Sequence, residues 1–461
     1  MSEKDKNSVS LYSGAAPEDV ARDLQPLVDF QEEGISLDTL TRLIQERLIP
    51  HFMNYGHPAF QSMFNFFPET AARRGAETAL AYNQGVTNWQ VSPGGAVLEE
   101  MCGRALCRLF GLGPEAGATF MYSGTYANQE AVYLALHRKA EEQGFDLNLK
   151  GLSGFKNPGK LRLMASRDAH FSVIHAARML GLGEDSLIFL DVDDQRRLDI
   201  NHFKKTIEHL KPNHDIFAAV ATAGTTSTGS VDPIAPAALV CRENRIWLHV
   251  DGAYGLAYAL IPGLKSLFAG IELADSVSWD PHKQFGVPIP SSVLFTRLGG
   301  DLMRPAVYGE YFNRRKDPHP NPGLKSPPST RPLSALPLAA SIRHLGLKKI
   351  TERLQAPLAA VKELHLKLRD YPDIESGHKP DTGILCFRVK PEGLPLDQVN
   401  RIQEFIYEKI MAEGRRTVSI TKLDGRVYLR LVALSPGVTC GHLWETVNLA
   451  RSLADEKINA G

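Results

Sequence analysis

The sequence has few cysteines, no long apolar run and no excess of either charge. Only 5 of its 461 residues are cysteine, and they are scattered without the spacing of a zinc site or a disulfide framework. We therefore expect no metal site and a reducing, cytoplasmic location. No apolar stretch approaches the roughly 18 residues of a membrane-spanning helix, and the first ten residues are polar and charged, unlike a signal peptide.

The charges balance, with 52 lysines and arginines against 52 aspartates and glutamates. Net charge therefore gives no reason to expect nucleic acid or an anionic membrane as a partner. A chain of 461 residues that is 43% hydrophobic can bury a large core. We expect a soluble intracellular protein with one large domain and a smaller one.

Strand-like and helical patterns alternate through the middle of the chain. Apolar runs predict strands over residues 161–165, 187–191, 216–222 and 246–250, with helices over 171–180, 200–211 and 233–243 between them. A further strand is expected over residues 287–296. Strands separated by helices predict an α/β fold with a mostly parallel sheet.

Three parts are expected along the chain. Residues 1–60 read as an N-terminal helical segment, residues 61–345 as the large domain, and residues 346–461 as a smaller C-terminal α/β domain.

Two charged residues follow apolar strands near the centre of the sequence. Asp251 ends the run Trp247-Leu-His-Val, and Lys283 follows Ser276-Val-Ser-Trp-Asp-Pro-His. The residues between them suffice for one helical excursion and a return to the same sheet, so both side chains are expected at its ligand-binding edge. Alone, such an aspartate is more often a turn or cap residue, and such a lysine is usually solvated. Together they suit pyridoxal phosphate, with Lys283 bonded to the cofactor and Asp251 holding its ring proton.

The joint pattern resembles the group II pyridoxal-dependent amino-acid decarboxylases, which act on glutamate, cysteine sulfinate, diaminobutyrate or aromatic amino acids. The resemblance rests on His249-Val-Asp-x-Ala253 and Asp275-x-Val-x-Trp-x-Pro-His-Lys283 and covers about residues 55–450. It implies a fold-type-I, aspartate aminotransferase-like enzyme that forms a homodimer, in which the N-terminal region packs across the partner.

A phosphate site is expected at Ser123-Gly124-Thr125, where a short strand turns into a helix. A helix start offers unpaired N–H groups and the positive end of the helix dipole. Alone, the segment would be read as an ordinary capped helix start. Thr125 stands where the family usually has glycine.

The resemblance assigns further residues to the cofactor. It implies that His170 stacks on the ring, that Thr222 lies beside it, that Ala253 packs under it and that His282 contacts the phosphate. Asp280 stands where many relatives have asparagine before Pro-His-Lys. Because a carboxylate would repel the phosphate, we expect Asp280 to point elsewhere or to be charge-compensated.

Three residues are candidates for substrate contact. Arg430 resembles the arginine that grips the α-carboxylate, although an arginine in an alternating strand usually faces solvent. Phe66 and Trp89 resemble the aromatic branch of the family, whereas the strands ending at Asp251 and Trp279 resemble the glutamate and cysteine-sulfinate branch. The pattern leaves the substrate open.

A polar, proline-rich stretch over residues 304–330 predicts a mobile loop or lid. The resemblance implies that a tyrosine of this loop returns a proton to the substrate. Tyr311 lies at close to the right distance after Lys283, and Tyr308 is the alternative.

The predicted function is pyridoxal-phosphate-dependent α-decarboxylation of an L-amino acid to an amine and carbon dioxide. The alternatives are another pyridoxal-dependent lyase, a decarboxylation-dependent oxidative deaminase, and a catalytically silent binding protein. Because Lys283, Asp251 and His170 are present, the silent alternative is the least favoured.

Overall fold

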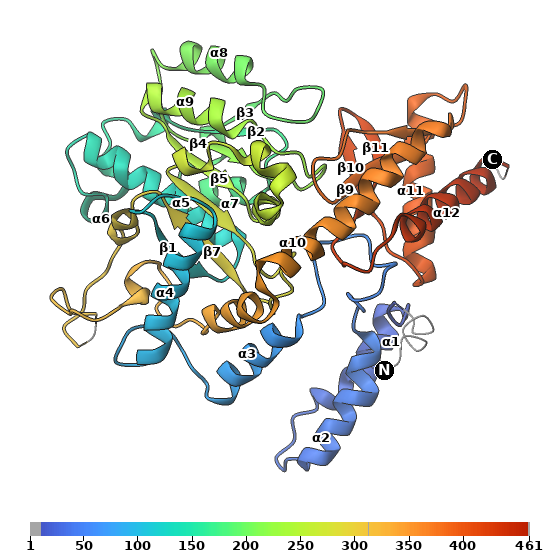
Figure 1. Cartoon of the computed structure of the whole chain (residues 1–461), viewed down its shortest axis with the longest axis horizontal. Coiled ribbons are helices and arrows are strands. Elements are labelled where there is room, and N and C mark those ends of the chain that lie inside the picture. Colours follow the sequence, from blue (N-terminus) through green and yellow to red (C-terminus); the bar gives the residue numbers. More distant parts are fainter. Residues whose placement is uncertain (1–10, 312, 460–461) are drawn as a thin grey trace. The chain divides into compact units, whose positions relative to one another are not determined.

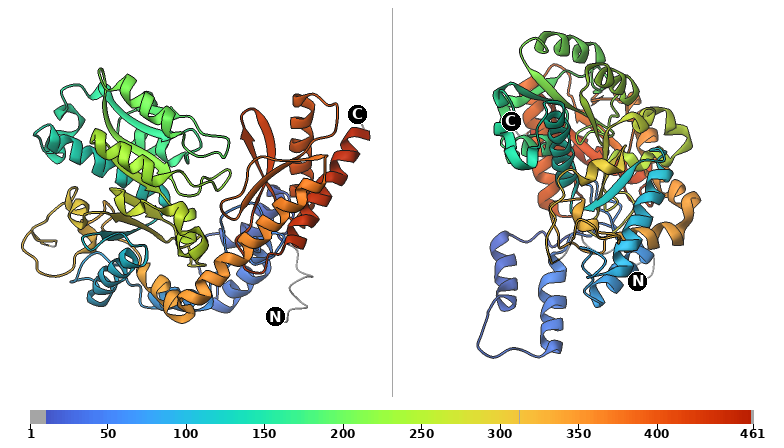
Figure 2. Two further views of the ribbon diagram at one scale, coloured as in Figure 1. Left: turned by 45° about the horizontal axis from the view of Figure 1, so that its top comes forward. Right: turned by 90° about the vertical axis from the view of Figure 1, so that its left-hand side faces the viewer.

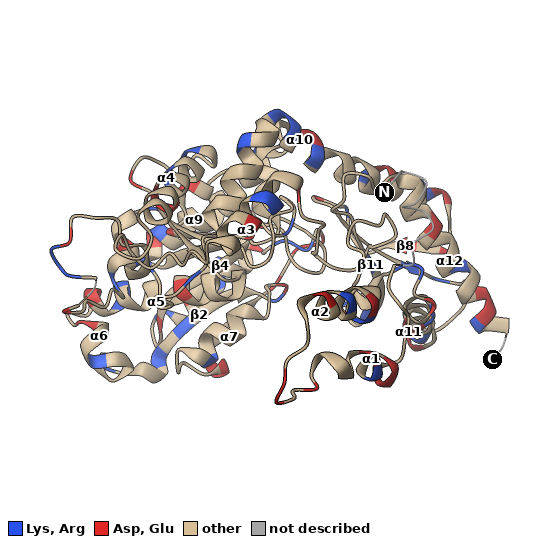
Figure 3. Cartoon of the chain, turned by 90° about the horizontal axis from the view of Figure 1, so that it is seen from below, with Lys and Arg blue, Asp and Glu red and all other residues tan. Residues whose placement is uncertain are grey.

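The computed structural model describes residues 11–311 and 313–459. The chain forms two compact units (Figure 1). Unit 1 comprises Met1–Phe67, Ala356–Gly377 and Gly383–Gly461, and unit 2 comprises Pro68–Gln355 with His378–Thr382. Basic and acidic residues both occur along the helices (Figure 3). Among the described residues, no helix is both long and apolar enough to cross a membrane.

Unit 2 is built on a seven-stranded sheet of order β1-β7-β6-β5-β4-β2-β3. The strands are β1 (Gly117–Met121), β2 (Leu161–Ser166), β3 (Leu187–Leu190), β4 (Asp215–Thr222), β5 (Trp247–Asp251), β6 (Ser276–Trp279) and β7 (Ser292–Thr296). Strand β7 is antiparallel to β1 and β6, and the other pairs are parallel. The predicted α/β fold with a mostly parallel sheet is confirmed.

Unit 2 also contains eight α-helical segments among its described residues. They are α3 (Thr70–Ala81), α4 (Pro93–Leu109), α5 (Gly124–Glu142), α6 (Leu147–Lys150), α7 (Ser172–Met179), α8 (Ile200–Leu210), α9 (Ile234–Asn244) and the first part of α10 (Ala335–Lys367), which breaks at Gly346. Helix α5 packs on β4 to β7. Its buried face is rich in alanine, including Ala127, Ala131 and Ala135, and such small side chains let the helix lie close to the sheet.

Two local expectations were wrong. The helix expected between β5 and β6 is replaced by the short 3₁₀ helices Gly255–Leu260, Pro262–Phe268 and Ile271–Leu273, because glycine and proline interrupt the segment. The strand expected over residues 287–296 begins only at Ser292, since Pro288 and Pro290 have no N–H group to donate to a ladder.

Unit 1 contains a four-stranded antiparallel sheet of order β10-β11-β9-β8. Its elements are β8 (Ile374–Ser376), β9 (Ile384–Val389), α11 (Leu396–Glu413), β10 (Ser419–Leu423), β11 (Arg426–Val432) and α12 (Cys440–Asn459). Side chains of the sheet, both helices and the end of α10 share one apolar core. This is the smaller α/β unit predicted after the large one.

The N-terminal segment of unit 1 forms two helices, α1 (Pro17–Leu24) and α2 (Leu37–Leu43), the second extended by a π-helical turn over Ile44–Leu48 (Figure 2). Neither helix buries a residue within this chain. Large apolar side chains are exposed here, among them Phe30 at 90% and Leu37 at 75%.

The close packing of the turn that follows β5 can be tested at Gly255. A Cβ atom at this position would lie 2.0 Å from the carbonyl oxygen of Ala223 and 3.0 Å from Cα of Gly224. Gly255→Ala should therefore lower the free energy of unfolding by about 1–3 kcal/mol. Gly263→Ala, where nothing lies within 4 Å of the added atom, is the matched control. Equal urea midpoints for the two variants would contradict the close packing of this turn.

Candidate active site

Asp251 ends β5 at the carboxyl edge of the sheet and is only 5% exposed. Its Oδ1 accepts a hydrogen bond from the Ala253 N–H at 3.1 Å, and its Oδ2 accepts one from the Asn128 amide at 2.8 Å. The Ser278 hydroxyl lies 3.3 Å from Oδ1. A buried carboxylate that receives several donors is stabilised in its charged form.

Asn128 belongs to a buried chain of hydrogen bonds. Trp247 Nε1 donates to Ser276 Oγ at 2.8 Å, and Ser276 Oγ lies 2.9 Å from Nδ1 of His249. His249 Nε2 lies 2.9 Å from Oδ1 of Asn128. Because an amide oxygen only accepts, the His249 proton is on Nε2, and Nδ1 accepts from the serine. Every donor in the chain therefore points toward Asp251.

The direction of these hydrogen bonds requires a neutral His249 ring. Burial lowers its pKa to about 4, although the Asp251 charge acts in the opposite sense. The ring is consequently neutral near pH 7, with one nitrogen donating and the other accepting. A protonated ring would donate from both nitrogens and reverse the bond to Ser276.

Asn128 was missed in the sequence analysis. It lies near the start of α5, is 2% exposed, and is flanked on the buried face by Ala127 and Ala131. A polar residue within an alanine-rich buried face is a usable signal, because a buried amide needs hydrogen-bond partners.

Lys283 and Asp280 form a turn just after β6, in which the Lys283 N–H donates to the Asp280 carbonyl at 3.0 Å. Asp280 is 3% exposed, and its Oδ2 lies 3.0 Å from Nζ of Lys283. Its Oδ1 accepts a hydrogen bond from the Ser292 hydroxyl at 2.6 Å. Asp280 is thus charge-compensated, one of the two predicted alternatives. His282 places Nε2 3.8 Å from the same carboxylate and donates from Nδ1 to the Ser291 carbonyl.

The start of α5 lies against this turn. A Cβ atom on Gly124 would lie 2.8 Å from Oδ2 of Asp280 and 3.0 Å from Cβ of Ala253. Ser123 caps the helix by accepting from the Tyr126 N–H at 3.4 Å. Within the described chain, the N–H groups of Gly124 and Thr125 have no hydrogen-bond partner. Two unpaired N–H groups at a helix start suit a phosphate.

His170 and Thr222 complete the set in unit 2. Burial lowers the pKa of His170, the Asp251 charge raises it and the Lys283 charge lowers it, so the ring lies within electrostatic reach of both. Its Nδ1 accepts from the Ser172 N–H at 3.2 Å. Thr222 pairs with Asp251 across β4 and β5, and its hydroxyl is buried without a partner among the described residues. An unpaired buried hydroxyl fits a site that binds a polar group.

Two of the predicted substrate residues belong to unit 1. Arg430 in β11 is 5% exposed, with Nε donating to Ser419 Oγ at 2.7 Å and Nη2 to the Ser62 carbonyl at 2.9 Å. It is therefore no solvated surface arginine. Phe66 is half-buried in the same unit. The substrate roles of Arg430 and Phe66 stay predictions.

The remaining candidates belong to unit 2. Trp89 stacks on His319 of the 304–330 loop, with ring centroids 5.0 Å apart. In the same loop, Tyr311 is 79% exposed, while Tyr308 is half-buried with the Arg315 guanidinium 4.6 Å from its ring centroid. Apart from the turn Pro322–Leu324, the described residues of the loop form no helix or strand. The roles of Trp89 and the tyrosines stay predictions.

Comparison with known proteins agrees with this geometry. The family model described as "Pyridoxal-dependent decarboxylase conserved domain" matches residues 17–390. The chain is 29% identical to an L-2,4-diaminobutyrate decarboxylase of Rhizobium meliloti (strain 1021), covering 93% of this chain and 84% of that protein. It is 27% identical to the acidic amino acid decarboxylase GADL1 of Mus musculus, covering 90% and 77%. The crystal structure of mouse CSAD in apo form superposes with a TM-score of 0.89 at 22% identity, covering 98% and 95%.

The chain belongs to the pyridoxal-dependent decarboxylase family. It is an enzyme that decarboxylates an amino acid with pyridoxal phosphate as cofactor, and its fold is fold type I. The predicted family, cofactor and reaction class are confirmed.

The donor chain can be tested at Asn128. Asn128→Asp would replace the amide that donates to Asp251 with a second carboxylate. The repulsion between the two carboxylates would weaken the partner of the cofactor ring. We expect turnover to fall by about 100-fold, a scale typical of losing one preorganised electrostatic contact, with an unchanged far-ultraviolet circular dichroism spectrum. Asp251→Asn should fold and retain much of the cofactor binding while losing turnover more severely.

The control for this prediction is Asn201→Asp, an exposed position on α8, which should keep normal turnover. Normal turnover of a folded Asn128→Asp enzyme would show that the chain does not support Asp251.

Proposed function

We propose that the enzyme removes the α-carboxylate of an L-amino acid as carbon dioxide and releases the amine. The observation that carries this proposal is the polarised donor chain that ends 2.8 Å from the Asp251 carboxylate. Lys283 follows β6, the neighbour of β5, at the same edge of the sheet as Asp251. It lies three residues after Asp280, whose carboxylate approaches the start of α5.

When bound, pyridoxal phosphate withdraws electrons from the substrate carbon whose bond breaks, and it does so best with its ring nitrogen protonated. Asp251 would hold that proton, because its donors keep it charged in a buried place. His170 would stack on the ring and Ala253 would pack beneath it, next to Gly124. Thr222 would direct its unpaired hydroxyl to the cofactor.

The phosphate would lie at the start of α5. The N–H groups of Gly124 and Thr125 would donate to it, with Ser123 and His282 beside them. Lys283 would be the residue bonded to the cofactor. When the Lys283 amine is bonded to the cofactor, Asp280 would still accept a hydrogen bond from the Ser292 hydroxyl.

Three residues would position the substrate, namely Arg430, Phe66 and Trp89. Arg430 would bind the α-carboxylate, since a guanidinium matches a carboxylate in two parallel hydrogen bonds. Phe66 and Trp89 would line the side-chain pocket. L-2,4-diaminobutyrate and acidic amino acids, named in two relatives, are the first substrates to test, followed by aromatic amino acids.

We propose that the enzyme acts as a homodimer in the cytoplasm. Helices α1 and α2 bury no residue within the chain, and both Leu37 of α2 and Phe30 between the two helices are exposed. A second copy would cover these apolar side chains. This assigns residues 1–60 to dimer packing, with residues 61–345 as the cofactor domain and 346–461 as the small domain. None of the five cysteines, all of which lie in the described part of the chain, forms a disulfide, which supports a reducing compartment.

The proposed function predicts where the cofactor is bonded and what is released. Protein loaded with pyridoxal phosphate should develop a visible absorbance band, and reduction with borohydride should fix the cofactor on Lys283, as peptide mass analysis would show. A panel of L-amino acids should then give carbon dioxide and amine in equal amounts. Ammonia and hydrogen peroxide with an aldehyde would indicate oxidative deamination instead. Labelling of another lysine would overturn the assignment of Lys283.

The loop tyrosines make a separate prediction. Tyr311→Phe removes only the hydroxyl, so cofactor binding should survive while proton return to the α-carbon slows. We expect the ratio of carbonyl product to amine to rise in Tyr311→Phe and to stay normal in Tyr308→Phe, measured over the same time course. Diversion in Tyr308→Phe alone would assign the proton to Tyr308, and diversion in neither would exclude this loop as the source.

A further inference from the structure

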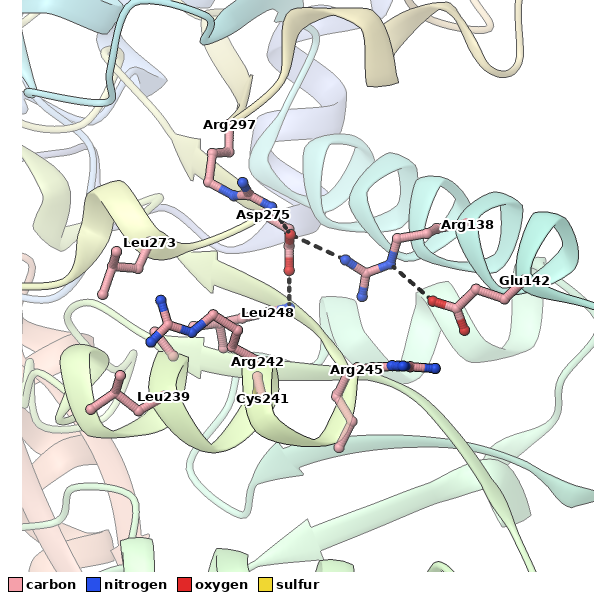
Figure 4. A pocket seen from close by; sticks show the side chains of 12 residues that line it. Arg138, Glu142, Leu239, Cys241, Arg242, Arg245, Leu248, Leu273, Asp275 and Arg297 are labelled. Atoms are coloured by element: carbon pink, nitrogen blue, oxygen red, sulfur yellow. Dashed lines mark hydrogen bonds and ion pairs between the residues drawn. The ribbon is translucent and has the colours of Figure 1, made fainter.

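A cavity of about 300 Å³ lies in unit 2 (Figure 4). Its lining places it at the amino ends of β5 and β6, whereas Asp251 is at the carboxyl end of β5. Its wall includes Leu248, the second residue of β5, and Asp275, which immediately precedes β6. Asp251 is three residues further along β5, or about 10 Å at the rise of a strand. This cavity therefore does not belong to the cofactor site.

Four arginines line the cavity together with two carboxylates. Asp275 binds Arg138 at 3.2 Å and Arg297 at 2.9 Å, and its other oxygen accepts from the Leu248 N–H at 2.9 Å. Arg138 also lies 3.9 Å from Glu142. Both carboxylates are thus engaged by the first two arginines, as the dashed lines of Figure 4 show.

The other two arginines, Arg242 and Arg245, come from the end of α9. Within the part of the chain that the structure describes, neither guanidinium group has a hydrogen-bond or ion-pair partner. The carboxyl end of a helix carries only about half a negative charge, less than the two positive charges these arginines add. Four guanidinium groups against two carboxylates leave two positive charges around the cavity.

The backbone at Arg245 supports a use for its side chain. Arg245 is the C-cap of α9 in the left-handed conformation, with φ at 57°. Glycine adopts this conformation at lower cost than residues with a Cβ atom do. Arg245 adopts this less favourable backbone conformation and places its positive charge at the cavity wall.

We propose that this cavity binds a small organic anion with at least two negative charges, carried by carboxylate or phosphate groups. Arg242 and Arg245 would bind the anionic groups, since a guanidinium matches either group with two parallel hydrogen bonds. Leu239 and Leu273 of the same wall would contact the carbon skeleton.

The test uses full-length enzyme loaded with pyridoxal phosphate, so that the cofactor phosphate site is filled. Isothermal titration calorimetry at constant ionic strength would measure binding of citrate and of pyrophosphate, with acetate as the monovalent control. We expect one of the two polyanions to bind. Binding of citrate would indicate a site for carboxylate groups, and binding of pyrophosphate would indicate a site for phosphate groups. The double variant Arg242→Gln/Arg245→Gln should lose at least tenfold in affinity, and Arg343→Gln, an exposed arginine of α10, should lose none.

Absence of binding by both polyanions, or equal affinity in the parent and the double variant, would overturn the proposal. Because both arginines are exposed, the double variant should keep the thermal midpoint of the parent, and the single variant Arg242→Gln provides a second measurement. The titration requires no turnover, so its outcome is independent of the proposed decarboxylation and its residues.

Discussion

A charged carboxylate at a buried place is the constraint on which the rest of the site depends. Burial without hydrogen-bond donors would disfavour the charged form of the Asp251 carboxylate. The structure avoids this with direct donors and with a chain that runs from Trp247 through Ser276, His249 and Asn128. Each residue of the chain donates a hydrogen bond to the next one, and the last donor is the Asn128 amide. The chain therefore holds the Asp251 carboxylate in place and favours its charged form.

Helix α5 connects the parts of this site. Its first residue, Gly124, approaches the Asp280 carboxylate and Ala253, and Asn128 follows about one turn later. The alanines of its buried face let it lie close enough to the sheet for the Asn128 amide to reach Asp251 across β5. The phosphate end and the ring-nitrogen end of the proposed cofactor site therefore depend on the packing of one helix. A change that lifts α5 from the sheet should disturb both ends together.

Sequence alone was sufficient for the features that depend on local patterns. Asp251 and Lys283 each follow an apolar strand, and the ends of parallel strands meet at one edge, so their proximity could be predicted together with the α/β fold. Asn128 could not be identified in this way, because its role depends on which residues of the sheet a helix face meets. The helix expected between β5 and β6 was wrong because glycine and proline outweighed its apolar content. The substrate roles of Arg430 and Phe66 depend on the placing of unit 1 and stay predictions.

We propose that the buried chain keeps Asp251 charged so that the cofactor ring nitrogen stays protonated. The most direct measurement is the ¹⁵N chemical shift of enzyme-bound pyridoxal phosphate labelled at the ring nitrogen. We expect the shift of a protonated pyridinium nitrogen in the parent enzyme across neutral pH, and that of an unprotonated nitrogen in Asp251→Asn. An unprotonated nitrogen in the parent, or the same shift in both proteins, would contradict it.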